Sequence, residues 1–462
     1  MDIPASQAEP MPGAPLRVLW LTRAFPEPAN SGEFLYSGGL IRSLAKTGAQ
    51  ISVIAHSRAN TDPTSLLENN DLNRGIDRDG VKWNLVAPIQ GGGRIWSLIS
   101  QLPSDSRRLA KGGAAQALRR QLRRGAEATW DVAVIDQAAN GWAVPMLVAA
   151  RAKGRIRAIA YLSHNAEAQI RPQIAAAYEG PLPLRQAMRW DAAKYAKLER
   201  AICQASDLIG SITAEDASSF RVVFPGKAEA VLPPGWATPP EFQPISGDRP
   251  RRVILVGSFE WIAKRMNLER LLAAAEPILR QAGIEIQVAG KADPQFVSRL
   301  THRFPALRFA ANVEEVGPFL RKARVGLMPD ELGGGFKLKS LDYIFHGIPI
   351  ASLRPAAAGL PLRSGDHYLA ADSFEDLAGQ IVGAIDNTGR LNGMAGSAHE
   401  ICLQHFRWES TGAKLDSALR RVAEFAEADR KARAAEAKGR GTPVSGDKPP
   451  LPVTALHRGN PL

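Results

Sequence analysis

The sequence predicts an α/β protein with two doubly wound parallel sheets, one in each half of the chain. A length of 462 residues exceeds what one hydrophobic core usually supports. Short apolar runs alternate with helical patterns along most of the chain, as in parallel sheets covered by helices. Residues 233–250 interrupt this alternation with six prolines and two glycines, a composition that regular elements do not tolerate. We therefore expect a domain boundary there.

The first half alternates strands and helices from residue 16 onward. Apolar runs with helical patterns between them are typical of parallel strands whose two faces are both buried. The expected strands are 16–22, 50–55, 81–86, 132–135, 156–162, 207–212 and 229–232, and the clearest helix is 185–205.

The second half restarts the same alternation and then becomes helical. Expected strands are 252–256, 284–288, 307–310, 325–328 and 348–353, with helices at 267–281, 294–303, 313–322 and 336–346. From residue 373 the pattern is helical to about 426, and the remainder has no periodicity. The predicted organisation is a disordered N-terminus (1–15), a first domain (16–235), a linker (236–250), a second domain (251–406), a C-terminal helix expected to return to the first domain (407–427) and a disordered tail (428–462).

Composition and cysteine usage restrict the class of protein. A hydrophobic fraction of 45% with 23% charged residues is ordinary for a globular chain. Cys203 and Cys402 are too few for a disulfide framework and show no metal-ligand spacing. The first fifteen residues do not resemble a signal peptide, and no apolar run is long enough to span a bilayer. We expect a cytoplasmic protein.

The formal net charge of +12 suits anionic phosphates, lipid headgroups or nucleic acid. Between residues 106 and 126 there are seven basic residues and no acid. Leu118 and Leu122, four residues apart, would share one helix face, so this segment could lie peripherally on the anionic inner face of the plasma membrane, near a lipid-linked acceptor. A solvated surface helix is the alternative. The candidate acceptor- or membrane-facing residues are Arg107, Arg108, Arg119, Arg120 and Arg123.

Candidate binding residues follow several strands, because ligands of open parallel sheets bind beyond the carboxyl ends of the strands. Gly32, just ahead of a predicted helix, could let backbone amides approach an anion; a plain turn is the alternative. Gly257 and Ser258 end another strand and precede Lys264 and Arg265, two cations that suit a diphosphate unless they belong to a solvated helix end.

The strongest local signal is the segment 331–352, ELGGGFKLKSLDYIFHGIPIAS. Gly333, Gly334 and Gly335 precede a predicted helix, and glycines there expose its first amides to a pyrophosphate. Lys337 would add charge, and Asp342, nearly two turns along, could accept hydrogen bonds from ribose hydroxyls. A glycine-rich connector with solvated lysines is the alternative.

This segment resembles the donor-site signature of glycosyltransferase family 4, the group 1 glycosyltransferases. The similarity extends over residues 16–426 and includes the segments 163–167, 232–235 and 256–261. It implies the GT-B fold, in which two Rossmann-like domains face each other across a cleft. It also implies that His164 lies near the transferred sugar. The candidate catalytic residues are His164, Lys264, Arg265 and Lys337, and the candidate donor-binding residues are Gly32, Gly257, Ser258, Gly333, Gly334, Gly335, Phe336, Leu338 and Asp342.

The resemblance also implies an activity. A sugar would move with retention of configuration, without a metal or other cofactor, from a nucleotide-diphosphate sugar, a UDP- or GDP-sugar, to a lipid-linked or saccharide acceptor in cell-surface or exopolysaccharide synthesis. Two departures stand out. Many family members have two glutamates separated by seven residues, where this chain has Gly334 and Asp342, and here Lys264 and Arg265 are adjacent rather than several residues apart.

Several other interpretations remain open at this level. The chain could be a catalytically silent nucleotide-sugar-binding scaffold, as Gly334 and Asp342 suggest, or another GT-B enzyme such as a nucleotide-sugar epimerase. The Asp77-Arg78-Asp79-Gly80 stretch resembles a metal-binding Asp-x-Asp motif, but Asp and Gly are more simply turn formers there, so no metal site is expected. Nucleic-acid binding would explain the charge but not the glycine-rich loop, so we expect no nucleic-acid partner.

Overall fold

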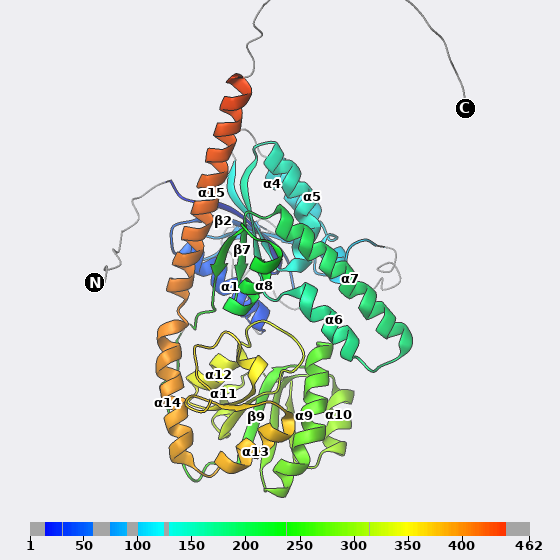
Figure 1. Ribbon diagram of the computed structural model, residues 1–462, viewed down its shortest axis with the longest axis vertical. Helices are drawn as coiled ribbons and strands as arrows, with labels where there is room; N and C mark the ends of the chain where they lie inside the picture. The colour runs from blue at the N-terminus through cyan, green and yellow to red at the C-terminus, as the bar shows by residue number, and fades with distance from the viewer. Residues whose placement is uncertain are drawn as a thin grey trace, which may run out of the picture.

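A computed structural model of the chain describes residues 14–29, 31–58, 74–89, 100–123, 129–236, 238–313 and 315–439. These residues form two α/β domains, an upper N-terminal one and a lower C-terminal one in the view of Figure 1. Each is built on its own sheet, with eight strands in the first and six in the second. The predicted fold class, two doubly wound Rossmann-like domains, is confirmed.

The N-terminal sheet has the strand order β3-β4-β2-β1-β5-β6-β7-β8 and is parallel except for β3, which runs antiparallel to β4. The chain order changes direction between β1 and β5, which pair directly. Such a switch point leaves a crevice beyond the carboxyl ends of the strands. The strands are β1 (Arg17–Ala24), β2 (Gln50–His56), β3 (Arg74–Ile76), β4 (Lys82–Val86), β5 (Trp130–Asp136), β6 (Ile156–Ser163), β7 (Leu208–Ser211) and β8 (Ala228–Val231).

Helices cover both faces of this sheet. The pair α6 and α7 pack side by side, and α6 lies at the boundary between the two domains (Figure 1). The helices are α1 (Gly32–Ala45), α3 (Ser104–Leu109), α4 (Ala114–Arg123), α5 (Val144–Ala152), α6 (Glu167–Ala177), α7 (Leu182–Ala205) and α8 (Ala214–Val223), with a 3-10 turn at Ala138–Ala143.

The C-terminal sheet is entirely parallel, with the order β11-β10-β9-β12-β13-β14. Its direction changes between β9 and β12, which places a second switch point there. The strands are β9 (Arg252–Ser258), β10 (Glu285–Lys291), β11 (Leu307–Ala311), β12 (Val325–Met328), β13 (Ile350–Leu353) and β14 (Leu369–Ala371). The helices are α9 (Ile262–Gln281), α10 (Pro294–Arg303), α11 (Gly317–Leu320), α12 (Lys339–Phe345), α13 (Phe374–Ala384) and α14 (Thr388–His405), with a 3-10 turn at Arg354–Ala357.

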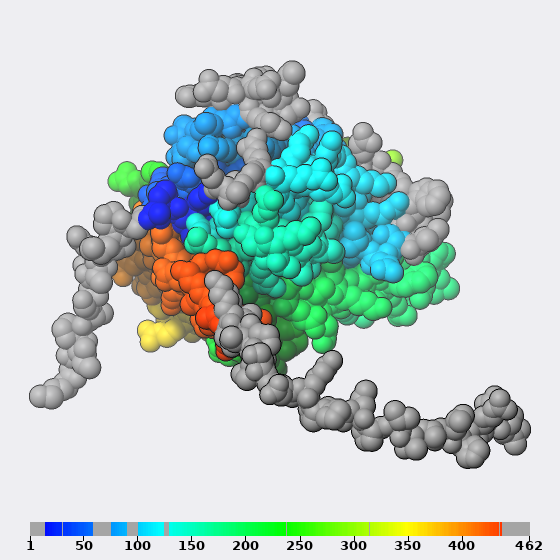
Figure 2. All heavy atoms as spheres, turned by 90° about the horizontal axis from the view of Figure 1, so that it is seen from above, coloured from blue at the N-terminus to red at the C-terminus, as the bar shows by residue number. Residues whose placement is uncertain are grey.

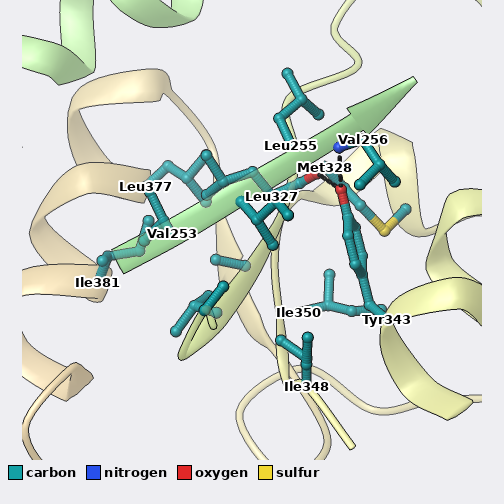
Figure 3. Packing of buried hydrophobic residues seen from close by; sticks show 14 of the residues in the cluster. Val253, Leu255, Val256, Leu327, Met328, Tyr343, Ile348, Ile350, Leu377 and Ile381 are labelled. Carbon is teal, nitrogen blue, oxygen red and sulfur yellow. Dashed lines mark hydrogen bonds between the residues drawn. The ribbon is translucent and has the colours of Figure 1, made fainter. Parts of the chain in front are cut away.

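A buried tyrosine bridges the two strands at this second switch point. The ladder between β12 and β9 pairs Val325 with Val253 and Gly326 with Ile254 and then ends. Beyond it the Tyr343 hydroxyl accepts a hydrogen bond from the Val256 amide at 2.9 Å and donates one to the Leu327 carbonyl at 3.2 Å (Figure 3). The hydroxyl therefore satisfies the two backbone groups where the strands part.

The last helix, α15 (Trp408–Gly439), packs against α1, β6 and β8 of the N-terminal domain. Leu415 and Leu419 on this helix are fully buried in the N-terminal core. The predicted disorder from residue 428 is wrong as far as residue 439, because alanines and ion pairs such as Arg433 with Asp429 favour helix there. Residues 440–462 and 1–13 of the predicted tails lie outside the described residues.

Most predicted elements are present, with three boundary corrections. The predicted helix at 313–322 shrinks to the short α11, and the one at 267–281 begins earlier, at Ile262. The predicted helix at 336–346 begins only at Lys339. Among the described residues, no helix is long and apolar enough to cross a bilayer.

Candidate active site

The glycine-rich loop of the C-terminal domain contacts the loop between β6 and α6 of the N-terminal domain. A Cβ atom on Gly334 would lie 2.8 Å from Ile170 Cγ1, and one on Gly335 would lie 2.6 Å from the His164 carbonyl oxygen. Gly335 also has a positive φ of 68°, which disfavours side chains. Only glycine fits this close approach, so the loop faces the other domain.

His164 follows β6 and is held by a buried carboxylate. Its Nε2 lies 2.7 Å from Oδ1 of Asp136, a fully buried residue at the end of β5. The other carboxylate oxygen accepts a hydrogen bond from the Thr22 hydroxyl at 2.8 Å. Burial by itself would raise the pKa of Asp136, but the His164 ring and the hydroxyl donors outweigh it, so the pKa is lowered. Asp136 is thus an ionised anchor at the first switch point.

Gln137 contacts the other side of the same imidazole. Its Nε2 lies 3.3 Å from His164 Nδ1, and its backbone has φ 72° and ψ 148°, a region that residues other than glycine rarely adopt. The Gln137 amide can donate to Nδ1 in the tautomer whose ring proton is on Nε2 and points at Asp136. The Tyr36 ring packs edge-on at 4.9 Å. The orientation of His164 is therefore set from three sides.

Three lysines and one aspartate form a cluster beside the glycine-rich loop, which we call the lysine cluster: Lys264, Lys337, Lys339 and Asp330. Lys339 forms an ion pair with Asp330, while Lys337 donates to the carbonyl oxygens of Gly334 at 2.6 Å and Gly335 at 3.0 Å. Burial, followed by the neighbouring ammonium groups, lowers the pKa of Lys264. Burial also lowers the pKa of Lys337, although Asp330 and Asp216 oppose this. An anion bound here would relieve the excess positive charge.

Arg265 does not join the lysine cluster. Its Nε donates to the Phe259 carbonyl at 2.6 Å, and its guanidinium lies 5.2 Å from the centre of the Phe296 ring. The sequence predicts that one of these two adjacent cations contacts phosphate, and the structure brings Lys264 to the cluster. Adjacent side chains of α9 point about 100° apart because of the helical turn. A catalytic contact of Arg265 stays a prediction.

The start of the glycine-rich loop is fixed by Asn267 of α9. Its amide nitrogen donates to the Leu332 carbonyl at 2.9 Å, and its oxygen accepts from the Leu332 amide at 3.0 Å. Gly333 and Gly335 then adopt φ values of 105° and 68°, outside the helical region. These turns, with Lys337 bonded to loop carbonyls, explain why the helix begins at Lys339.

Asp342, on α12, has no hydrogen-bond partner for its carboxylate within the described part of the chain. Burial raises the pKa of this group to about 7. A carboxylate in such a position gains from a ligand that brings hydroxyl donors. The sequence-based expectation that Asp342 meets ribose hydroxyls stays a prediction.

The other predicted donor-binding residues occupy two neighbourhoods. Gly32 lies at the start of α1, which Ser31 caps, and a Cβ there would lie 3.1 Å from the Leu338 side chain. Phe336 and Leu338 pack against both domain cores, so they join the domains. Gly257 and Ser258 end β9, and the Ser258 hydroxyl donates to Glu260 at 3.1 Å.

Within the basic segment, α4 is amphipathic, but its apolar face packs on the core of the domain. Leu118 is fully buried against the sheet, with Ala117 and Gln121 beside it, so the apolar face of α4 belongs to the core. Arg119, Arg120 and Arg123 are exposed, and Figure 2 shows this cyan part of the chain at the surface. Arg107 and Arg108 are half-buried, and Arg108 pairs with Asp105.

The Asp-x-Asp stretch forms a turn. The Asp77 carboxylate accepts hydrogen bonds from the amides of Asp79 and Val81, both at 3.0 Å, and from Trp83 Nε1 at 2.8 Å. These contacts close the turn before β4. No group of three or more His, Cys, Asp or Glu side chains with metal-binding geometry occurs among the residues that the structure describes.

Sequence reasoning missed four residues of the site: Asp136, Gln137, Asp330 and Tyr343. Asp136, Gln137 and Asp330 closely follow predicted strands, so their strand-end positions were a usable signal. Tyr343 had no such signal, because its role depends on β9, which is far away in the sequence.

Comparisons with known proteins agree with this geometry. Residues 250–387 match the family model described as "Glycosyl transferases group 1". A search of curated proteins gives no significant match.

Solved structures resemble nearly the whole chain. Sucrose-phosphate synthase from Thermosynechococcus elongatus has a TM-score of 0.64 at 15% identity, covering 88% of this chain and 99% of that one. Anabaena HepE in complex with UDP and glucose gives 0.55 at 13% identity, covering 88% and 99%. The UDP-forming trehalose-phosphate synthase of Burkholderia xenovorans gives 0.56 at 14% identity, with the same coverage. At these identities the likeness shows the fold alone.

The fold and the family match converge on one class of enzyme. The structure has two Rossmann-like domains; the glycine-rich loop of one contacts the His164 loop of the other, and the lysine cluster lies beside the glycine-rich loop. The matched family model covers the domain that carries that loop and cluster. The second domain therefore matches the group 1 glycosyltransferases over residues 250–387, and the chain as a whole has the GT-B fold.

Proposed function

We propose that this protein transfers a sugar, with retention of configuration and without a metal, from a UDP- or GDP-sugar to a saccharide or lipid-linked acceptor on the N-terminal domain. The lysine cluster carries the proposal, because half-buried ammonium groups beside glycine-rich backbone suit the diphosphate of a nucleotide sugar. Two structural neighbours support such a donor: HepE is described with UDP and glucose, and a trehalose-phosphate synthase is described as UDP-forming.

In this mechanism positioning and charge stabilisation do most of the work. The bond from the sugar's anomeric carbon to the diphosphate breaks, and a bond to the acceptor hydroxyl forms on the same face. The acceptor proton passes to the departing phosphate oxygen. Lys264, Lys337 and Lys339 stabilise the negative charge on the diphosphate, a task that a metal ion performs in other enzymes. Asp342 accepts from the ribose, and His164, fixed by Asp136, lies beside the sugar.

The donor is tested by thermal unfolding with UDP-, GDP- and ADP-sugars, because a ligand bound only by the folded state raises the melting temperature. Lys337→Ala should abolish the shift. Lys322→Ala, which removes an exposed lysine of the same domain, should leave it unchanged. His164→Ala should retain the shift and lose turnover. A full shift in Lys337→Ala would remove the lysine cluster from donor binding.

A lipid-linked acceptor, in synthesis of a cell-surface polysaccharide, would need contact with the inner face of the membrane. The exposed arginines of α4 supply positive charge for that contact, although the buried apolar face of α4 does not insert. Binding to vesicles containing anionic lipid should weaken with salt. It should also weaken when Arg107, Arg119, Arg120 and Arg123 become Gln, and unchanged binding would exclude this surface.

A catalytically silent nucleotide-sugar-binding scaffold is the second candidate. It is favoured by Gly334, which provides no side chain to contact the donor sugar. Ile170 occupies the space that a side chain on this residue would need. A donor that raises the melting temperature but is neither hydrolysed nor transferred, with any lipid-linked extract as acceptor, would support the scaffold.

A further inference from the structure

Helix α6 starts at the interdomain face without a cap of its own. It begins at Glu167, immediately after the His164–Asn165 loop that meets the glycine-rich loop. Its N-cap residue is Ala166, whose side chain has no oxygen to accept from the first free amides. Ile170, in the first turn of this helix, occupies the space that a side chain on Gly334 would need. The start of α6 therefore determines how the N-terminal domain meets the donor loop.

Glu199, on the neighbouring helix α7, supplies the missing cap. Its Oε2 accepts the Ala168 amide at 2.7 Å, and its Oε1 accepts the Glu167 amide at 3.2 Å. The same Oε1 accepts the hydroxyl of Tyr161, on β6, at 2.8 Å. One carboxylate thus ties the end of β6 and the first turn of α6 to α7, on both sides of His164.

The loop that Glu199 holds is also bonded internally and to the other domain. The Ser163 hydroxyl donates to the Asn165 carbonyl at 2.7 Å. The Asn165 amide nitrogen, oriented so that both ends of the amide are satisfied, lies 3.0 Å from the Gly334 carbonyl oxygen. A displacement of the first turn of α6 would therefore reach both His164 and the glycine-rich loop.

We propose that Glu199 is a positioning residue for glycosyl transfer: by capping α6 from α7 it sets the place of His164 and Ile170 against the donor domain. This inference rests on the function proposed above. Glu199 touches no reacting atom, and its effect passes entirely through the loop between β6 and α6. No other capping side chain for α6 exists within the described residues.

The cap depends on the charge of Glu199. This residue is only 2% exposed, and burial raises the pKa of its carboxyl to about 7, although the amide and Tyr161 hydrogen bonds oppose the shift. Its titratable neighbours are Glu167 from α6, Tyr161 from β6 and Cys203, one turn further along α7. Lys197 and Arg200 line the adjacent groove. The residues that α8 contributes to this groove are uncharged. Protonation would remove an acceptor from the α6 amides, so activity should fall below about pH 7.

The test compares Glu199→Gln with the wild type in hydrolysis and transfer of UDP-glucose. We expect kcat to fall about tenfold or more with little change in KM for the donor, and the acidic limb of kcat to flatten. Ala166→Ser in the same variant, which provides an N-cap on α6 itself, should restore part of kcat. Glu276→Gln is the matched control, because Glu276 is also buried and accepts a backbone amide, that of Ala306 at 3.1 Å, in the other domain.

Tyr161→Phe provides a second, milder variant in case Glu199→Gln does not fold. Loss of the Tyr161 hydrogen bond should raise the pKa of Glu199 further and move the acidic limb of kcat to higher pH. A wild-type kcat and pH profile in Glu199→Gln, or an unmoved limb in Tyr161→Phe, would overturn the proposal.

Hydrogen exchange separates this inference from the proposed function. Amides 164–171 should exchange faster in Glu199→Gln than in the wild type or in Glu276→Gln, with no donor present. If the wild-type protein turns over no nucleotide sugar, the proposed function fails, and exchange of this segment alone then decides whether Glu199 positions the loop. Unchanged exchange would overturn the positioning role.

Discussion

Tyr343→Phe tests whether a single hydroxyl holds the second switch point together. The substitution keeps the ring that packs over Gly326 and removes only the oxygen between β9 and β12. Val256 and Leu327 are 4% and 0% exposed, so water cannot easily replace that oxygen. The Val256 amide and the Leu327 carbonyl would both lose a partner.

The expected loss of stability follows from those two groups. A buried backbone group left without a partner costs about 1–3 kcal/mol, so Tyr343→Phe should lower the free energy of unfolding of the C-terminal domain by about 2–4 kcal/mol. The loss would be smaller if β9 and β12 moved together and the Val256 amide bonded directly to the Leu327 carbonyl. The aromatic ring, which lies beside Gly326, hinders that movement. Urea unfolding, with hydrogen exchange of a peptide spanning residues 252–259 as the local readout, measures the effect.

Tyr195→Phe is the matched control. Tyr195 is 1% exposed, and its hydroxyl has no hydrogen-bond partner among the residues that the structure describes. Removing that hydroxyl breaks no hydrogen bond and relieves a buried polar group without a partner, so the free energy of unfolding should not fall and should rise by up to about 1–3 kcal/mol. If Tyr343→Phe unfolds at the same urea concentration as the wild type, and the Val256 amide exchanges no faster, the bridge contributes nothing and the reasoning is refuted.

Three further predictions address the donor loop, the basic segment and the unpartnered carboxylate. Gly335→Ala should weaken UDP-glucose binding about tenfold in calorimetry, because a side chain at positive φ costs about 1–2 kcal/mol and would press on the His164 carbonyl; an unchanged Kd contradicts this. Leu118→Ala should lower the free energy of unfolding by about 2–5 kcal/mol in a urea titration, whereas a membrane-facing leucine would give almost no change. The pKa of Asp342 is raised to about 7, so its ionisation lowers the free energy of unfolding of the wild type as pH rises from about 4 through 7. The free energy of unfolding of Asp342→Asn should therefore rise relative to that of the wild type by up to about 4 kcal/mol between pH 4 and 8. If the two proteins show parallel pH profiles of unfolding, burial does not raise that pKa.

The sequence by itself determined the architecture and the position of the glycine-rich loop. Alternating apolar runs and helical patterns indicated two parallel sheets, because strands buried on both faces need continuous apolar residues. Glycines and lysines following a strand indicated an anion site, because parallel sheets bind ligands beyond the carboxyl ends of their strands. Both inferences depend on local order along the chain, which the sequence displays directly.

Only the tertiary structure decided which groups meet across the fold. Leu118 looked available for contact with a membrane, but the sheet covers it. Arg265 looked available for phosphate, but its guanidinium donates to the Phe259 carbonyl. Glu199 caps a helix that begins more than thirty residues before it in the chain, at Glu167. Periodicity shows which face of an element is apolar, but not what covers that face or where a side chain finds its partner. Those partners come from distant segments, and folding alone brings them together.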